Sequence, residues 1–336
     1  FDEKHQDFIG RTITKKLFAS RSSEGDVHGH GTHCIGTACG PLRPTTGPRY
    51  GVAYEAEIYA GKVLGDDGFG TDRSIIAGMD WALDQKCHII SMSLGAATRV
   101  GDQLNDDYEQ IGQVCLDAGT LVVAASGNES ARPQRISPVG SPANASTIMA
   151  VGAVDSALVP APFSCGGINP GQEVDIAAPG VGVLSCLPGN KYDRWDGTSM
   201  ATPHVAGVAA LIAQSDAKFR GWALWARLVQ IASRLRFPAR RSITTRHSNA
   251  PSFPLPSCRC LSGWRRKTIP SKSSGTRPRY PTRPHPPRDL SRSSLPCGRS
   301  SLGFSEDRPQ GRDERGLAFG ARRRSDFLLF SLRGLQ

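Results

Sequence analysis

The stretch G-T-S-M-A-T-P-H-V-A-G-V-A-A-L-I-A-Q, residues 197–214, decides how the rest of the sequence is interpreted. Thr198 and Ser199 are typical of a helix start, and we expect Pro203 in the first turn, where its missing N–H costs little. Positions 205–213 are almost all small or apolar, which predicts a helix buried on all sides. A hydroxyl at the start of such a helix lies beside unpaired N–H groups and the positive end of the dipole. Ser199 is therefore a candidate nucleophile for attack on a carbonyl group, with an ordinary N-cap serine as the alternative.

Two other stretches supply further groups that acyl transfer needs. Residues 28–36 read H-G-H-G-T-H-C-I-G, and residues 120–129 read T-L-V-V-A-A-S-G-N-E, an apolar run that ends at Gly127 and Asn128. A histidine base, an amide donor and a serine at a helix start are three parts of an acyl-transfer site. In this order, the blocks HGHGTH, AASGNE and GTSMATPHVAG resemble the signatures of the subtilisin-like serine proteases (subtilases). The resemblance covers roughly residues 1–235.

The resemblance implies an endopeptidase that cleaves peptide bonds through an acyl-enzyme. Ser199 would attack, His30 would take and return the proton, and Asn128 with the Ser199 N–H would stabilise the oxyanion. Residues 1–11 match the end of the family's aspartate block, so we expect the triad aspartate three positions before Phe1, outside this chain. This chain alone is therefore expected to be inactive or impaired. The alternative is a non-catalytic, peptide-binding pseudoprotease, although a binding module has no need of all three groups together.

The resemblance also indicates where a substrate would lie. Two segments would pair with the substrate main chain from either side by strand addition, and a third would form one wall of the pocket for the residue before the scissile bond. Small residues in that wall predict a roomy, apolar pocket. The residues concerned are Ser93, Leu94 and Gly95 in the first segment, Gly68 and Gly70 in the second, and Ala125, Ser126 and Gly127 in the wall.

Between these blocks, apolar runs typical of buried strands alternate with segments that have the helical spacing of apolar residues. Such alternation predicts a parallel sheet covered on both faces, with active groups at the carboxyl ends of its strands. We therefore predict a three-layer α/β/α fold with a mostly parallel central sheet, which is the subtilase architecture. The expected strands are 58–64, 88–93, 121–125, 148–154 and 174–177, and the expected helices are 30–39, one capped at Asp72, 104–118 and 219–235.

The formal net charge of +11 is distributed unevenly. Residues 1–240, the predicted peptidase domain, contain 21 Lys and Arg against 24 Asp and Glu, whereas residues 241–336 contain 20 against 6. This Arg-, Pro- and Ser-rich tail has almost no periodic apolar pattern, so we predict that it is disordered or a non-native continuation. Binding of nucleic acid is not expected, because aromatic residues are sparse there and no known binding module is visible.

The expected chemistry requires no cofactor. The nine cysteines do not follow the spacing of a zinc site, so no metal is assigned, and disulfide pairing stays open. Asp7 matches a position that often ligates calcium in the family, but the loop 40–49 lacks the family's asparagine-bearing pattern, so a structural calcium ion also stays open. Asp26, four residues before His30, is disfavoured as a substitute for the triad aspartate.

The expected partner is a protein or peptide substrate, and a monomer is expected. No apolar run is long enough for a membrane span, and no signal peptide is visible, so the compartment stays undetermined. Cys34 directly follows His33, as in the proteinase-K-like branch of the family, and we expect its thiol near the catalytic histidine.

Overall fold

The computed structural model describes residues 1–20, 22–232 and 329–333. The chain divides into two units, Phe1–Arg241 with Ala321–Gln336, and Ser242–Gly320, of which the second lies outside the described residues. Most of the predicted tail, 241–336, also lies outside them, and only 329–333 can be compared with the prediction.

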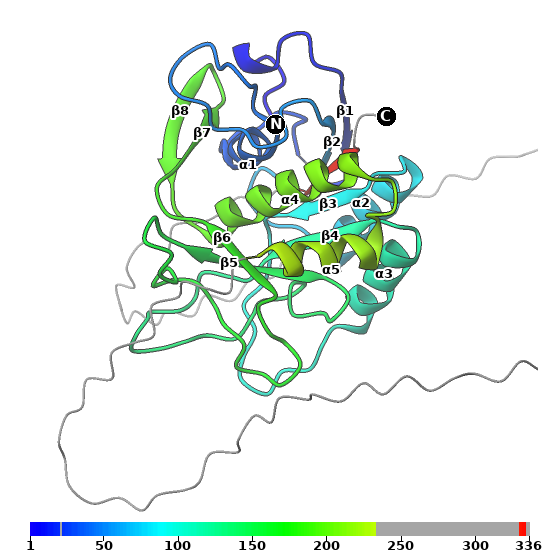
Figure 1. The fold of residues 1–336 in the computed structure, drawn as a ribbon, viewed down its shortest axis with the longest axis vertical. Helices are drawn as coiled ribbons and strands as arrows, with labels where there is room; N and C mark the ends of the chain where they lie inside the picture. The colour runs from blue at the N-terminus through cyan, green and yellow to red at the C-terminus, as the bar shows by residue number, and fades with distance from the viewer. Residues whose placement is uncertain (21, 233–328, 334–336) are drawn as a thin grey trace, which may run out of the picture. The chain divides into compact units, whose positions relative to one another are not determined.

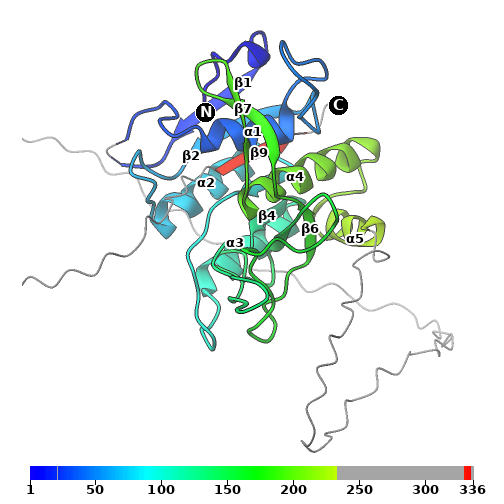
Figure 2. The same cartoon turned by 90° about the vertical axis from the view of Figure 1, so that its left-hand side faces the viewer.

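A seven-stranded sheet forms the centre of the described unit (Figure 1). All neighbouring strands in it pair in parallel except β9, which comes from the predicted tail and pairs antiparallel with both of its neighbours. Figure 2 shows β9 in red at its place within the sheet. The spatial order is β1 (Ile13–Leu17), β2 (Glu57–Lys62), β9 (Leu329–Arg333), β3 (Ile89–Met92), β4 (Leu121–Ala125), β5 (Met149–Val154) and β6 (Ile176–Pro179).

Alternate residues of the buried strands face two different helical layers. In β4, Leu121 and Val123 belong to one apolar cluster, and Val122 and Ala124 to the other. This period of two puts one layer of helices on each face of the sheet, as the sequence predicts. The first cluster includes residues of α1 (His30–Cys39), α4 (Thr198–Ser215) and α5 (Gly221–Ile231), and the second includes residues of α2 (Asp72–Asp84) and α3 (Asp106–Asp117).

A separate antiparallel hairpin covers part of α1. It consists of β7 (Val183–Leu187) and β8 (Lys191–Trp195), and neither strand is among those predicted from the sequence. Ser185 Oγ of this hairpin donates to the carbonyl oxygen of His33 at 2.8 Å, which fixes β7 against α1. The short 3-10 helix Gln6–Phe8 precedes β1.

The first turns of α4 differ from the prediction in one respect. The helix begins at Thr198 as expected, but Pro203 is its sixth residue and lies in the second turn. Because proline has no N–H, the Ser199 carbonyl four residues earlier has no intrahelical donor. Ser93 Oγ donates to this carbonyl at 2.8 Å and Cys34 Sγ at 3.5 Å. A hydroxyl and a thiol from neighbouring elements thus replace the missing helical hydrogen bond.

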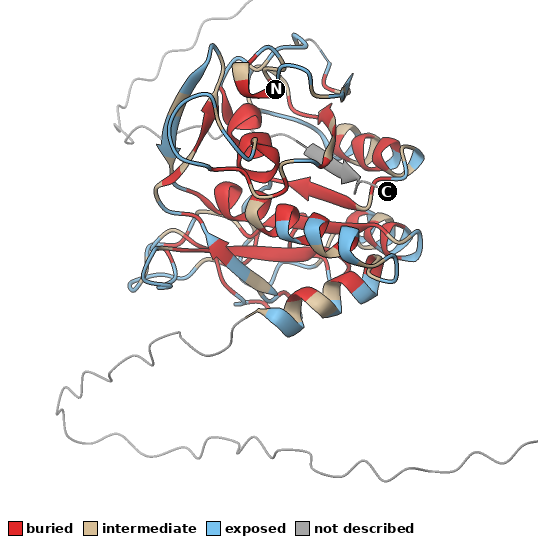
Figure 3. Ribbon diagram, turned by 45° about the horizontal axis from the view of Figure 1, so that its top comes forward, coloured by how far each residue is buried: buried red, intermediate tan, exposed pale blue. Residues whose placement is uncertain are grey.

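The predicted burial of α4 on all sides is only partly right. Ten of the first twelve residues of α4 are buried. Its outer face is partly exposed, however: Val208 is 36% and Leu211 42% exposed. Figure 3 shows the same contrast between buried strands and helices whose outer faces carry exposed residues. None of the described helices combines the length and the apolar character needed to cross a bilayer.

Candidate active site

The candidate nucleophile and base lie at the starts of two helices that pack against each other. His30 is the first residue of α1, and Ser199 is the second residue of α4. The Cys34 thiol lies between them: its Sγ is 3.8 Å from both Nδ1 and Nε2 of His30 and 3.5 Å from the Ser199 carbonyl oxygen. The thiol of Cys34 therefore lies beside His30, as expected, and it contacts both candidate residues.

The carboxamide of Asn128 is oriented by the residue that precedes the candidate nucleophile. Its Oδ1 accepts hydrogen bonds from the N–H and the hydroxyl of Thr198, both at 2.9 Å. A Cβ built on Gly197 would lie 3.6 Å from Ser199 N and 3.7 Å from Asn128 Nδ2, so both expected oxyanion donors border the same point. The N–H groups of the first helical turn have no intrahelical partner, which leaves the Ser199 amide able to bind an anion.

A hollow beside Ser199 brings together four of the eight predicted substrate-binding residues. Its lining comes from the ends of β3 and β4, from the segment at Gly140 and from the start of α4. The lining residues are Leu94, Gly95, Ala96, Ala125, Gly127, Asn128, Glu129, Gly140, Thr198 and Ser199.

Four predicted substrate-binding residues do not line this hollow. The Ser93 hydroxyl donates to the Ser199 carbonyl, and the Ser126 N–H donates to the Val151 carbonyl. Both residues therefore bind the elements behind the hollow and do not line it. Gly68 and Gly70 lie in the loop between β2 and α2, where Gly68 has a φ of 80° that favours glycine. A Cβ on Gly70 would lie 2.2 Å from a Leu64 methyl carbon, so the loop passes close to the end of β2.

The environment keeps the candidate base neutral. His30 is only 4% exposed, and its burial, followed by the neighbouring charge of His33, lowers its pKa to about 3, although Asp26 acts in the opposite direction. A histidine with such a pKa carries no proton on its free nitrogen at neutral pH. That nitrogen is therefore free to accept a proton, but a pKa this far below neutral pH makes the ring a weak base.

The Asp26 carboxylate binds the first turn of α1. It accepts from the N–H of Gly29 at 2.8 Å, and from the N–H and the hydroxyl of Thr32, both at 2.7 Å. These donors occupy both oxygens and stabilise the first turn of the helix. This geometry agrees with the expectation that Asp26 does not replace the triad aspartate of His30.

Asp7, the position considered for calcium, is satisfied by protein groups. Its carboxylate accepts from Thr45 N at 2.8 Å, Tyr50 Oη at 2.6 Å and Tyr192 Oη at 2.8 Å. Within residues 1–20, 22–232 and 329–333, no three His, Cys, Asp or Glu side chains form a group that could hold a metal ion. The six cysteines in this part of the chain are buried, and none of them forms a disulfide bond.

Sequence reasoning missed two residues of the site. Glu129 lines the hollow, and its carboxylate accepts a hydrogen bond from the Cys165 thiol at 3.2 Å. Trp195, four residues before Ser199, stacks against the histidines of α1. The position of Glu129 directly after Asn128 could have signalled its role, but no local pattern connects Trp195 to α1.

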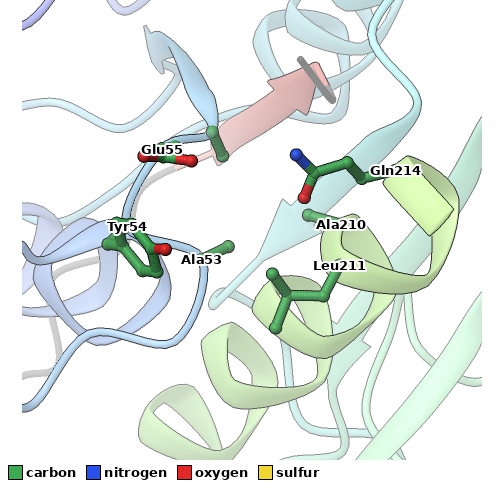
Figure 4. Close-up of a pocket in the computed structure, with 7 residues that line it drawn as sticks. Ala53, Tyr54, Glu55, Ala210, Leu211 and Gln214 are labelled. Atoms are coloured by element: carbon green, nitrogen blue, oxygen red, sulfur yellow. The ribbon is translucent and has the colours of Figure 1, made fainter. Parts of the chain in front are cut away.

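A second hollow, of about 50 Å³, lies at the other end of α4 (Figure 4). Tyr54 and Glu55 from the segment before β2 lie on one side of it, and Leu211 and Gln214 of α4 on the other. This end of α4 is about 17–23 Å from Ser199 at 1.5 Å per helical residue. The hollow therefore takes no part in the site around Ser199.

Comparison with known proteins identifies the family. Residues 9–250 match the model of the subtilase family. The chain belongs to this family. Subtilisin BL of Lederbergia lenta is 44% identical to this subtilase over 194 residues, which cover 58% of this chain and 66% of that protein. The major intracellular serine protease of Bacillus subtilis (strain 168) is 38% identical over 212 residues, 63% of each chain.

Solved structures agree with the sequence comparison. Sphericase superimposes on this subtilase with a TM-score of 0.60 and 30% sequence identity, covering 68% of this chain and 79% of sphericase. The predicted family and the predicted three-layer fold are thus confirmed. The chain spans 66% of Subtilisin BL, 46% of alkaline elastase YaB of Bacillus sp. (strain YaB) and 72% of subtilisin of Bacillus pumilus.

Proposed function

We propose that this subtilase is a serine endopeptidase that hydrolyses peptide bonds through an acyl-enzyme. The observation that carries the proposal is the meeting of His30, Ser199 and Asn128 at the starts of α1 and α4, from positions 30, 128 and 199 of the chain. A peptide-binding module would require the hollow but not this combination of a base, a nucleophile and an oriented amide.

In the proposed mechanism, Ser199 Oγ attacks the carbonyl carbon and His30 removes its proton. The Ser199 hydroxyl is buried and has no hydrogen-bond partner among the described residues, so its hydrogen bond to His30 would form only when the substrate is bound. The Ser199 N–H and Asn128 Nδ2 then stabilise the oxyanion, and His30 returns the proton to the leaving amine. Water hydrolyses the acyl-enzyme by the same steps in the second half of the reaction.

The substrate would be a protein or peptide in extended form. Leu94 and Gly95 follow the end of β3, where an added strand could pair with them, whereas the next residue, Ala96, already pairs with Ser141. Ala125 and Gly127 would border the side chain that precedes the scissile bond. Glu129 adds a carboxylate to this pocket, which the sequence alone predicts to be apolar.

Labelling by a fluorophosphonate probe tests the proposal, because such probes modify only an activated serine. We expect the folded 336-residue chain to be labelled on Ser199, over a long incubation so that slow reaction is still detected. Ser199→Ala should abolish labelling, whereas Ser91→Ala, at a buried serine of β3 outside the site, should leave it unchanged.

Replacement of the proposed oxyanion donor Asn128 should lower the rate of labelling by a known amount. Asn128→Ala should slow labelling by ~10²–10³, the range that loss of one such donor causes in subtilisin itself, a member of this family. Folded protein that resists labelling but binds an extended peptide aldehyde or peptide analogue in calorimetry would instead support the non-catalytic, peptide-binding alternative.

A further inference from the structure

The indole of Trp195 covers both histidines at the start of α1. Trp195 is the last residue of β8, and its ring stacks on that of His33 with centroids 4.9 Å apart and planes inclined by 6°. The same indole is stacked alongside His30, with centroids 6.3 Å apart and planes inclined by 29°. One aromatic side chain of the hairpin thus contacts the candidate base and its neighbour.

The hairpin fixes the indole and His33 from the same side. Trp195 Nε1 donates to Asp193 Oδ2 at 3.2 Å, which restrains the edge of the ring. His33 Nε2 lies 3.1 Å from the Val183 carbonyl oxygen and 3.3 Å from that of Asp193. Because these partners belong to β7 and β8, the stack depends on the hairpin rather than on α1 alone.

Burial under the indole has a consequence for both imidazoles. Trp195 is partly exposed, whereas His30 is 4% and His33 0% exposed, so the indole is the boundary between these rings and solvent on the side of β8. Burial is the largest cause of the low pKa of each ring, about 3 for His30 and about 4 for His33. Removing the cover would hydrate the rings and favour their charged forms.

We propose that Trp195 is a positioning residue for the candidate base: by stacking along the two imidazoles it excludes water and holds a neutral His30 beside Cys34 and Ser199. The inference rests on the proposed function, because a neutral, oriented imidazole matters only where His30 accepts a proton. Trp195 does not itself take part in the bond changes.

An NMR titration of histidines labelled with ¹³C at Cε1 tests this inference. The His30 resonance is assigned by its loss in His30→Gln and followed between pH 5 and 8. We expect no titration of His30 in the parent. In Trp195→Ala its pKa should rise above 5, at least a hundredfold gain in proton affinity, while Trp195→Phe should restore the parent behaviour.

Trp222→Ala is the matched control, because Trp222 is 49% exposed on α5 and its ring lies tilted against that of Trp225. It should leave the His30 titration unchanged. If Trp195→Ala does not fold, as judged by circular dichroism, Trp195→Gln replaces it, since the polar glutamine side chain neither stacks on the rings nor excludes water from them. A His30 that stays untitrated in the folded variant, or that shifts equally in Trp222→Ala, overturns the inference.

Fluorophosphonate labelling of the same variants separates this inference from the proposed function. A pKa shift in Trp195→Ala with no labelling of the parent would overturn the catalytic proposal and leave the cover by Trp195 intact. Labelling of the parent without a pKa shift in Trp195→Ala would overturn the positioning role alone.

Discussion

Pro203 determines how the candidate nucleophile is held. Its missing N–H frees the Ser199 carbonyl, and Ser93 and Cys34 take over as donors. A hydrogen bond contributes about 0.5–1.5 kcal/mol net, so the exchange costs little stability. As a result, the Ser199 carbonyl is held not by α4 itself but by Ser93, which follows β3, and by Cys34 of α1.

The buried histidines make stability depend on pH. His33 has a pKa of about 4 in the folded chain, because of its burial, against an ordinary value of 6.5. Between these values the unfolded chain binds a proton that the folded chain does not. Stability is therefore fully present above pH 6.5 and falls toward pH 4, by about 1.4 kcal/mol per pH unit for this group. His33→Gln should reduce the loss in the free energy of unfolding between pH 7 and pH 5, measured by urea denaturation at both pH values.

The comparison must be made between parent and variant. Asp175 has the opposite effect, because burial raises its pKa to about 6 and the folded chain then gains a proton as the pH falls. This contribution is common to both proteins and cancels in the difference. Equal loss of stability in parent and His33→Gln between pH 7 and 5 would contradict the assignment.

At the scale of elements, the close crossing of α1 and α4 depends on glycine. A Cβ on Gly207 would lie 2.6 Å from Val52 Cβ and 3.1 Å from the Ala38 carbonyl oxygen. The backbone of α4 can therefore approach α1 and the segment after it only where this side chain is absent. Because Ser199 and His30 lie on these two helices, their separation depends on the same contact.

Gly207→Ala should destabilise the fold although alanine favours helix. Overpacking costs about 1–3 kcal/mol, whereas the gain in helix propensity is at most about 1 kcal/mol. We expect a net loss of about 1 kcal/mol or more in the free energy of unfolding, measured by urea denaturation. Val208→Ala, at the next and partly exposed position, should change it by less than about 0.5 kcal/mol. A Gly207→Ala variant as stable as the parent would show that the two helices can separate.

Elements with a local signal were predictable. The buried runs of β3, β4 and β5 and the start of α1 at His30 agree with the predictions to within one or two residues. The helix predicted over 104–118 begins instead at Asp106, because Asn105 caps it through a hydrogen bond to Asp107 N. For the helix predicted over 219–235, α5 ends at Ile231, and residues 233–235 lie outside the described part.

Elements without a local signal were not predicted. β1 reads I-T-K-K-L with three exposed residues at the edge of the sheet, so it has no apolar run. The β7–β8 hairpin and the stack of Trp195 on His33 depend on contacts between distant parts of the chain. His30, Asn128 and Ser199 could be proposed because each occupies a signature block. The contacts of Trp195 and Glu129 were missed because no local spacing encodes them.

At the scale of the whole molecule, the sheet is completed from the far end of the chain. β9 pairs with β2 over five positions and with β3 over four, so it joins the β1–β2 pair to the remaining strands. Without it, two inner strands would each have an unpaired edge, and unpaired backbone groups in a sheet are costly unless water reaches them.

Deletion of residues 321–336 should therefore destabilise the described unit by several kcal/mol, at about 1 kcal/mol per lost hydrogen bond. The measurement is the urea midpoint of the truncated chain. Removal of 334–336 alone, which spares β9, is the control and should leave the midpoint unchanged. A truncated chain with the parent's midpoint would show that the sheet does not need β9.

The place of β9 has a consequence for synthesis. β3 is complete at Met92, and the first residue of β9 follows 237 positions later. At about 5–20 residues per second, the ribosome needs roughly 12–47 s to translate that interval. During this time the inner edges of β2 and β3 emerge without their partner, so the nascent chain is open to mispairing and chaperone capture until β9 has been synthesised.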